Sequence, residues 1–236
     1  MLILAIDTSG KNGGIALARG DAQTCDVVAM SAIAHGTYSA QLIPQIDELL
    51  RGAGIKLAEV EGFAVAAGPG SFTGLRVGLA TVKGLAEIVD RPIAAVSVLE
   101  CVASLALPML AVFPSRRLLF AALDAGRSEV FVGEYRVEPD GLGLQQEMIV
   151  SAAGLVAHVR GQEQSGAGIV ATPDNVVLDA LKAGGMPAMK TGHVHVTDVA
   201  RIGLRKLAAG ETTPGAALDA NYIRRSDAEI FSQPKH

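Results

Sequence analysis

The sequence predicts an α/β protein made of two similar halves, each with a mixed sheet flanked by helices. Short apolar runs that suit buried strands alternate with segments whose apolar residues recur every three or four positions, as in amphipathic helices. The order of these segments in the first half returns in miniature in the second. Half of the 236 residues are hydrophobic and only 19% are charged, which predicts a packed core.

The first half is expected to begin with a β-hairpin, because Ser-Gly and Asn-Gly pairs separate its first two apolar runs. Strands are predicted at residues 2–6, 15–18, 27–33, 63–67 and 92–96, and helices at 38–50, 75–89 and 97–105. Pro44 lies inside the first helix and should kink it. This order is that of a ribonuclease-H-like half-domain, in which three antiparallel strands are followed by a helix, a strand, a helix and a strand.

In the second half, the same patterns predict strands at residues 118–123, 130–135, 146–150 and 167–171, and helices at 152–159, 174–183 and 197–209. Ile3–Asp7 and Phe120–Asp124 are alike, since each is an apolar strand that ends in Asp before a glycine-bearing hairpin. We predict an N-terminal lobe over residues 1–107 and a smaller C-terminal lobe over 108–236. Whether the last helix packs back on the first lobe is left open.

The composition argues against several classes of protein. A net charge of −4 disfavours a self-sufficient nucleic-acid binder, which needs clustered Lys and Arg. Cys25 and Cys101 are too few for a disulfide framework or a metal motif. Met1–Ile6 lacks a basic start and runs into Asp7, so it predicts a strand rather than a signal peptide. No run of 18 apolar residues suggests a membrane span, and we expect a cytoplasmic protein.

A glycine loop precedes the second helix. Its structural residues are predicted to be Gly68, Pro69, Gly70, Ser71 and Gly74. Ser71 or Thr73 is expected to cap the helix. The spacing fits neither a Walker A loop nor a dinucleotide fingerprint, so a tight turn is favoured over an anion site. Glycines inside the helix, Gly74 and Gly78, indicate that the sheet, a phosphate or another protein is pressed close against it.

Other candidate residues have two interpretations. Asp7, Thr8, Ser9 and Asp124 suit phosphate and Mg²⁺, but Asp, Ser and Gly also belong in ordinary hairpin turns. His193 and His195 would share one face of a strand, but no further ligand lies nearby, so a spacing that arose by chance is favoured over a zinc site.

The two helices of the first half also offer a surface for a protein partner, since small-residue helices pack closely on other helices. Leu42, Ile46 and Leu49 either cover the sheet or contribute to this surface. Small and apolar groups are also expected on outward-facing positions, at Tyr38, Ala40, Arg76, Leu79, Ala80, Lys83 and Glu87. The predicted partner-binding residues are Tyr38, Leu42, Ile46, Leu49, Arg76, Leu79, Ala80 and Lys83.

The chain resembles the TsaB (YeaZ) family over nearly its whole length. The resemblance lies in the segments Ile3–Ser9, Ala67–Gly78, Ala95–Glu100, Ala122–Val130 and Tyr222–Arg224. It implies a duplicated actin-like ATPase (ASKHA) fold and a non-catalytic subunit that dimerises with TsaD, which makes N6-threonylcarbamoyladenosine at position 37 of tRNA. One departure is Asp219–Asn221, where the family usually has a proline.

The resemblance also implies how the subunit works. The helices at 38–50 and 75–89 would bind TsaD, or pair two copies when TsaD is absent, and TsaE would join the complex. TsaD holds metal through two histidines on the first of these helices, where this sequence offers only His35. No catalytic residue, metal or cofactor is therefore expected, beyond weak nucleotide at the interface, and tRNA would be reached only through the complex.

Two alternatives stay open. A small ATP-dependent kinase or ATPase would use Asp7 and Asp124, which end similar strands in the two halves. A metallopeptidase would need His193 and His195 as ligands.

Overall fold

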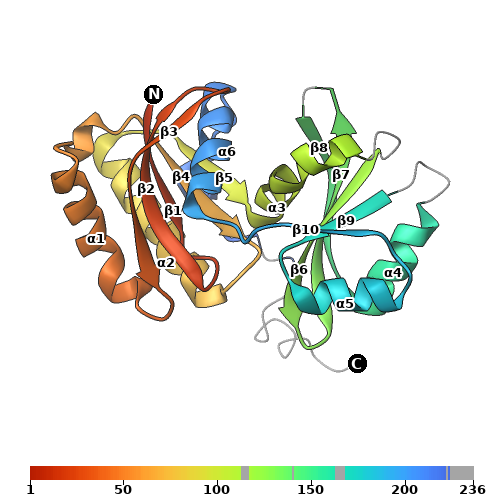
Figure 1. Cartoon of the computed structure of the whole chain (residues 1–236). Helices are drawn as coiled ribbons and strands as arrows, with labels where there is room; N and C mark the ends of the chain where they lie inside the picture. Colours follow the sequence, from red (N-terminus) through yellow and green to blue (C-terminus); the bar gives the residue numbers. More distant parts are fainter. Residues whose placement is uncertain (113–116, 140, 163–167, 222, 224–236) are drawn as a thin grey trace, which may run out of the picture. The chain divides into compact units, whose positions relative to one another are not determined.

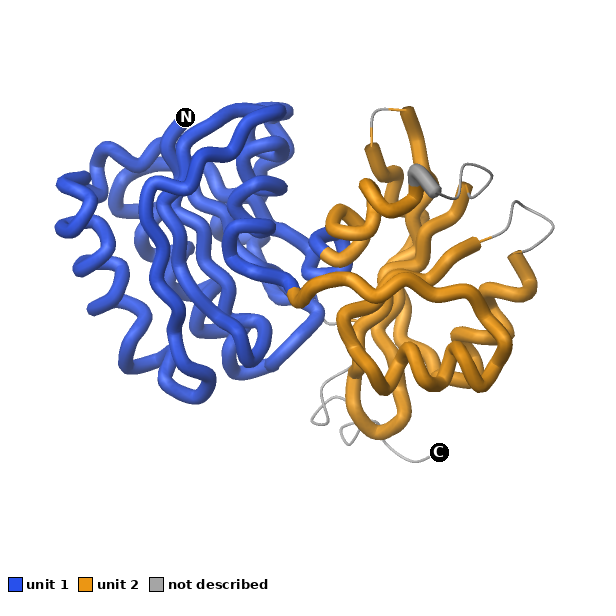
Figure 2. The backbone as a smooth tube through the Cα atoms, in the orientation of Figure 1, with its two compact units in different colours: residues 1–101, 194–221 blue, residues 102–193, 222–236 orange. Residues whose placement is uncertain are grey.

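The computed structural model describes residues 1–112, 117–139, 141–162, 168–221 and 223, and these form two compact units (Figure 2). Unit 1 contains residues 1–101 and 194–221, and the described residues from 102 to 193 belong to unit 2. We expected the break between residues 107 and 108. The division instead falls after Cys101, within the helix α3 (Val98–Ala106), and the last long helix belongs to unit 1.

Unit 1 is a three-layer α/β/α structure (Figure 1). Its sheet has the order β3-β2-β1-β4-β5, in which β1 pairs antiparallel with β2 and parallel with β4. The strands are β1 (Leu2–Asp7), β2 (Asn12–Gly20), β3 (Cys25–Ala34), β4 (Gly62–Gly68) and β5 (Ile93–Ser97). Helices α1 (Tyr38–Gly52) and α2 (Phe72–Val89) cover one face, and α6 (Val196–Ala208) covers the other.

The far end of the chain returns to the α2 side of this sheet. After α6, a segment that we call the strap (Thr212–Asn221) bonds Thr213 N to Ile93 O at 2.8 Å and Asn221 N to Ala67 O at 2.7 Å. It contains the short 3₁₀ helix η4 (Gly215–Ala217) and places Leu218 in the core beneath α2. The strap thus closes the α2 face of the sheet.

Unit 2 repeats the topology of unit 1, with the sheet order β8-β7-β6-β9-β10. Its strands are β6 (Leu118–Gly126), β7 (Glu129–Glu138), β8 (Gly141–Ser151), β9 (Gly168–Thr172) and β10 (Ala188–Lys190). Helices α4 (Ala152–Gly161) and α5 (Asn175–Ala183) pack together over this sheet. Short 3₁₀ helices η1 (Leu57–Glu59) and η2 (Leu107–Val112) complete the described elements.

The element order in both halves agrees with the predicted duplicated fold. The structure adds β10, which the sequence did not predict, and starts α2 three residues early, at Phe72. Pro44 lies inside α1, which is a single helix. Among the described residues, no helix has both the length and the apolar character needed to cross a bilayer.

Candidate functional site

The glycine loop joins β4 to α2 and is anchored to the chain's own first hairpin. Gly68 has φ of 118°, which favours glycine, and the peptide bond to Pro69 is cis. Ser71 caps α2 by accepting a hydrogen bond from Gly74 N at 3.3 Å, and its own N–H donates to Ser9 O at 2.7 Å. A Cβ at Gly70 would collide with the same carbonyl of Ser9, so this glycine is needed for close packing.

The group pressed against the helix glycines is Thr8, the residue that directly follows β1. A Cβ on Gly74 would collide with the carbonyl oxygen of Thr8, and one on Gly78 with the Thr8 hydroxyl. Thr8 itself is completely buried. Of the three neighbours considered from the sequence, the structure therefore places the protein's own sheet against Gly74 and Gly78.

Most of the predicted partner-binding residues lie in the core of unit 1. Tyr38 and Leu79 were expected to face outward, but each exposes only 4% of its surface. Leu79 shares a helix face with Leu75, Val82 and Ala86, and that face packs on β4. Leu42, Ile46 and Leu49 are likewise buried, so they cover the sheet. Arg76 and Ala80 are exposed and Lys83 is half-buried.

Part of the exposed side of the same two helices is small and apolar. We define the outer face by Ala40 and Ile43 of α1 and by Ala80, Gly84 and Ile88 of α2, all of them exposed. Ile43 and Ile88 expose 54% and 75% of their surface. The spacing of α2 could have identified Ile88, because it lies opposite the buried stripe of that helix.

Neighbouring contacts fix how these helices lie. Gln45 of α1 accepts a hydrogen bond from Ser31 of β3 at 2.8 Å, so Ile43 lies on the other flank of α1, toward α2. The two helices pack against each other. At the start of α2, the Arg76 guanidinium lies 3.8 Å from the centre of the exposed Phe72 ring.

In the first hairpin, Asp7 and Ser9 bond to each other inside the protein. Asp7, Thr8 and Ser9 expose 3%, 0% and 6% of their surface. One oxygen of Asp7 accepts from Ser9 N at 2.8 Å and from the Ser9 hydroxyl at 2.6 Å. Burial raises the pKa of Asp7, and the two bonds from Ser9 only partly oppose it. A hairpin built to hold a magnesium phosphate would instead present an accessible carboxylate and free amides.

The corresponding hairpin of unit 2 is also closed by carboxylates. Asp124 N donates to Asp174 Oδ2, and Gly126 N donates to Asp124 Oδ1, both at 2.8 Å. Arg127 and Ser128 form the turn with positive φ.

Within the described part of the chain, no three His, Cys, Asp or Glu side chains are grouped closely enough to hold a metal ion. His195 precedes α6, where its N–H donates to Asp198 Oδ2 at 3.0 Å. His35 stacks edge-on against Tyr38, with ring centres 6.0 Å apart.

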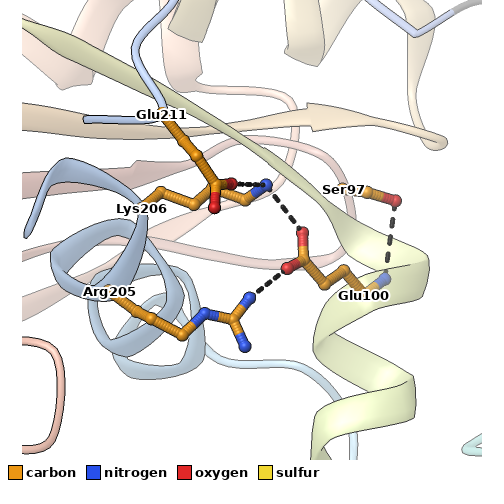
Figure 3. Close-up of polar contacts among 5 residues, drawn as sticks. All are labelled: Ser97, Glu100, Arg205, Lys206 and Glu211. Atoms are coloured by element: carbon orange, nitrogen blue, oxygen red, sulfur yellow. Dashed lines mark hydrogen bonds and ion pairs between the residues drawn. The ribbon is translucent and has the colours of Figure 1, made fainter. Parts of the chain in front are cut away.

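An ionic cluster joins the start of α3 to the end of α6 (Figure 3). Glu100 pairs with Arg205 through one oxygen and with Lys206 through the other, at 3.3 Å, and Lys206 lies 3.6 Å from Glu211. Glu100 N also donates to the Ser97 hydroxyl at 3.5 Å. The Ala95–Glu100 motif thus has a structural use within unit 1.

Two similar sheets, each with an antiparallel hairpin beside two parallel strands, define an α/β protein with a duplicated fold. The model of the family described as TsaD, tRNA N6-adenosine threonylcarbamoyltransferase, matches residues 30–190. The chain belongs to this family and, within it, to the TsaB (YeaZ) proteins.

Individual relatives cover different shares of the chain. The tRNA threonylcarbamoyladenosine biosynthesis protein TsaB of Escherichia coli is 28% identical over 232 residues, 97% of this chain and 96% of that protein. The Haemophilus influenzae protein of the same name is 33% identical over 134 residues, and this match spans only 53% of its length and 57% of this chain. A Pseudomonas aeruginosa structure described as similar to peptidase YeaZ has a TM-score of 0.70 and 25% identity, covering 94% of this chain and 99% of that one.

Proposed function

We propose that the chain takes part in the synthesis of threonylcarbamoyladenosine in tRNA, as a non-catalytic subunit that docks on TsaD through its outer face. The names of the relatives support the pathway, and the match to the TsaD family supports a partner of related fold. The observation that carries the docking role is the exposed set of small and apolar residues on α1 and α2.

Small residues let a partner helix approach the backbone of α2 closely, and large apolar residues at the margin then gain most from burial. Ala80 and Gly84 supply the close approach, while Ile43 and Ile88 supply apolar area. Burying a large aliphatic side chain contributes about 1.5–3 kcal/mol, so the two isoleucines would be the main anchors. The buried residues Tyr38, Leu42, Ile46, Leu49 and Leu79 act indirectly, by fixing the helices on the sheet.

The non-catalytic role is supported by the two hairpins. Phosphate would have to displace the internal carboxylate bonds of Asp7 and Asp174 and would meet the negative charge of Asp124. These features weigh against the kinase or ATPase alternative, which measurable ATP turnover by the purified chain would restore.

The same proposal extends to the other partners. Because the outer face suits a helix pair of similar shape, two copies of the chain would pair through it when TsaD is absent. TsaE would join the assembled pair, and tRNA and any weakly bound nucleotide would be met by the complex rather than by this chain alone.

The experiment is a binding titration against TsaD from the same source, with Ile88→Asp and Ala80→Arg. Both substitutions change exposed positions, so each variant should fold. Each should lose binding by at least about tenfold, because a charge would be buried at the contact. The matched controls are Val176→Asp on α5, where the native side chain is 68% exposed, and Ala208→Arg on the exposed side of α6. Unchanged affinity in both outer-face variants would refute the docking role, and Leu79→Glu is unsuitable because it buries a charge in the core.

A further inference from the structure

A groove of about 800 Å³ opens beside α2, on the flank that faces the strap. Its walls are the last turns of α2, the residues that lead into β5, and the first residues of the strap. The charged residues that line it are Lys83, Glu87, Asp90 and Arg91. Lys83 and Glu87 follow Ala80 and Gly84 of the outer face by three residues each, so the groove adjoins that face along one helix.

The groove is held open by a fixed wall. The strap is tied to the sheet at both ends, through Thr213 N to Ile93 O and Asn221 N to Ala67 O. Between these bonds, Leu218 is 1% exposed and packs in the core of unit 1. An incoming segment would therefore meet a preformed surface and would not need to order it first.

Within the described residues, none of the four charges forms an ion pair with another group of the protein. Glu87, Asp90 and Arg91 are exposed, so water can solvate them. Lys83 is half-buried at the groove, one helical turn from the exposed Glu87. Because Lys83 forms no ion pair within the described residues, its ammonium group is complementary to a carboxylate carried by an occupant.

We infer that this groove receives an extended segment of the protein that docks on the outer face, and that the segment places an Asp or Glu side chain on Lys83. This inference rests on the proposed docking function. The continuity of the groove with the outer face favours a segment of that same partner, and its open shape and charges of both signs suit a peptide better than a small anion.

The test measures the affinity for TsaD of Lys83→Ala and Lys83→Glu, with Lys182→Glu on α5 as the charge-matched control. Lys83→Ala should weaken binding about tenfold, Lys83→Glu should weaken it further, and the control should bind like the native chain. The native complex should also weaken with added salt more steeply than the complex of Lys83→Ala.

Equal affinity of both Lys83 variants and the control would overturn the inference. If Ala80→Arg nevertheless abolishes binding in the same assay, docking on the outer face holds and only the groove assignment fails. If Ala80→Arg and Ile88→Asp also bind normally, the proposed function fails as well. Binding of inorganic phosphate by the free chain, lost in Lys83→Ala, would assign the groove to a small anion and contradict a peptide occupant.

Discussion

Alanine at Gly74, Gly78 and Gly84 should have three different effects on stability, because one helix meets three different surroundings at these positions. Gly84 is exposed and an added Cβ meets nothing within 4 Å, so Gly84→Ala should stabilise the protein by about 1 kcal/mol through helix propensity alone. At Gly78 the Cβ strikes the buried hydroxyl of Thr8. Overpacking typically costs about 1–3 kcal/mol, and the propensity gain of about 1 kcal/mol leaves a net loss near 1 kcal/mol.

At Gly74 the obstacle is the carbonyl of Thr8, a backbone group that cannot turn away as a side chain can, so the net loss should reach about 2–3 kcal/mol. A second substitution separates the two collisions. Thr8→Ala removes the hydroxyl, which has no hydrogen-bond partner among the described residues, and should rescue Gly78→Ala but not Gly74→Ala. Urea unfolding followed by circular dichroism gives each free energy. Equal effects of the three alanines, or rescue of Gly74→Ala by Thr8→Ala, would refute the assigned packing of α2.

Three further predictions concern the polar groups. Burial raises the folded-state pKa of Asp7 above its ordinary value of 3.8, so the folded state binds the proton more tightly and stability falls as pH rises through that raised pKa. In urea titrations, Asp7→Asn should therefore be more stable than the native chain at pH 8, and the difference should vanish below pH 3.8. Glu100→Gln should lower the free energy of unfolding by about 1–2 kcal/mol, because Lys206, whose side chain is only 19% exposed, then keeps only its 3.6 Å contact to Glu211. Stability equal to that of the native chain would contradict a stabilising role of this ionic cluster. Asp174→Ala removes the acceptor of the Asp124 amide, so hydrogen exchange at that amide should accelerate at least about tenfold, and unchanged protection would show that this bond does not hold the hairpin.

Local patterns predicted much of the fold. The short apolar runs identified most strands, and Ser71 was one of two expected caps because it stands where the strand-to-helix turn ends. The glycine spacing also indicated a close neighbour of α2. The strand at Ala188–Lys190 was missed because three residues are too few to show alternation.

Which side of each helix is buried was harder to predict, because it depends on which sheet lies beneath the helix. Leu79 belongs to the apolar stripe of α2, yet it was assigned outward together with its neighbour Ala80, and the structure buries it. The packing of α6 on the first sheet depends on contacts between residues far apart in sequence, such as the close approach of Gly203 to Ala64. No local pattern encodes such a contact, so the sequence left the position of the last helix open.

The docking claim is tested most directly by amide hydrogen exchange of the chain with and without TsaD. The account predicts slower exchange in peptides from α1 and α2 when TsaD is present, and unchanged exchange in peptides from α6 and α5. Protection confined to the hairpins that follow β1 and β6, or to unit 2, would contradict it.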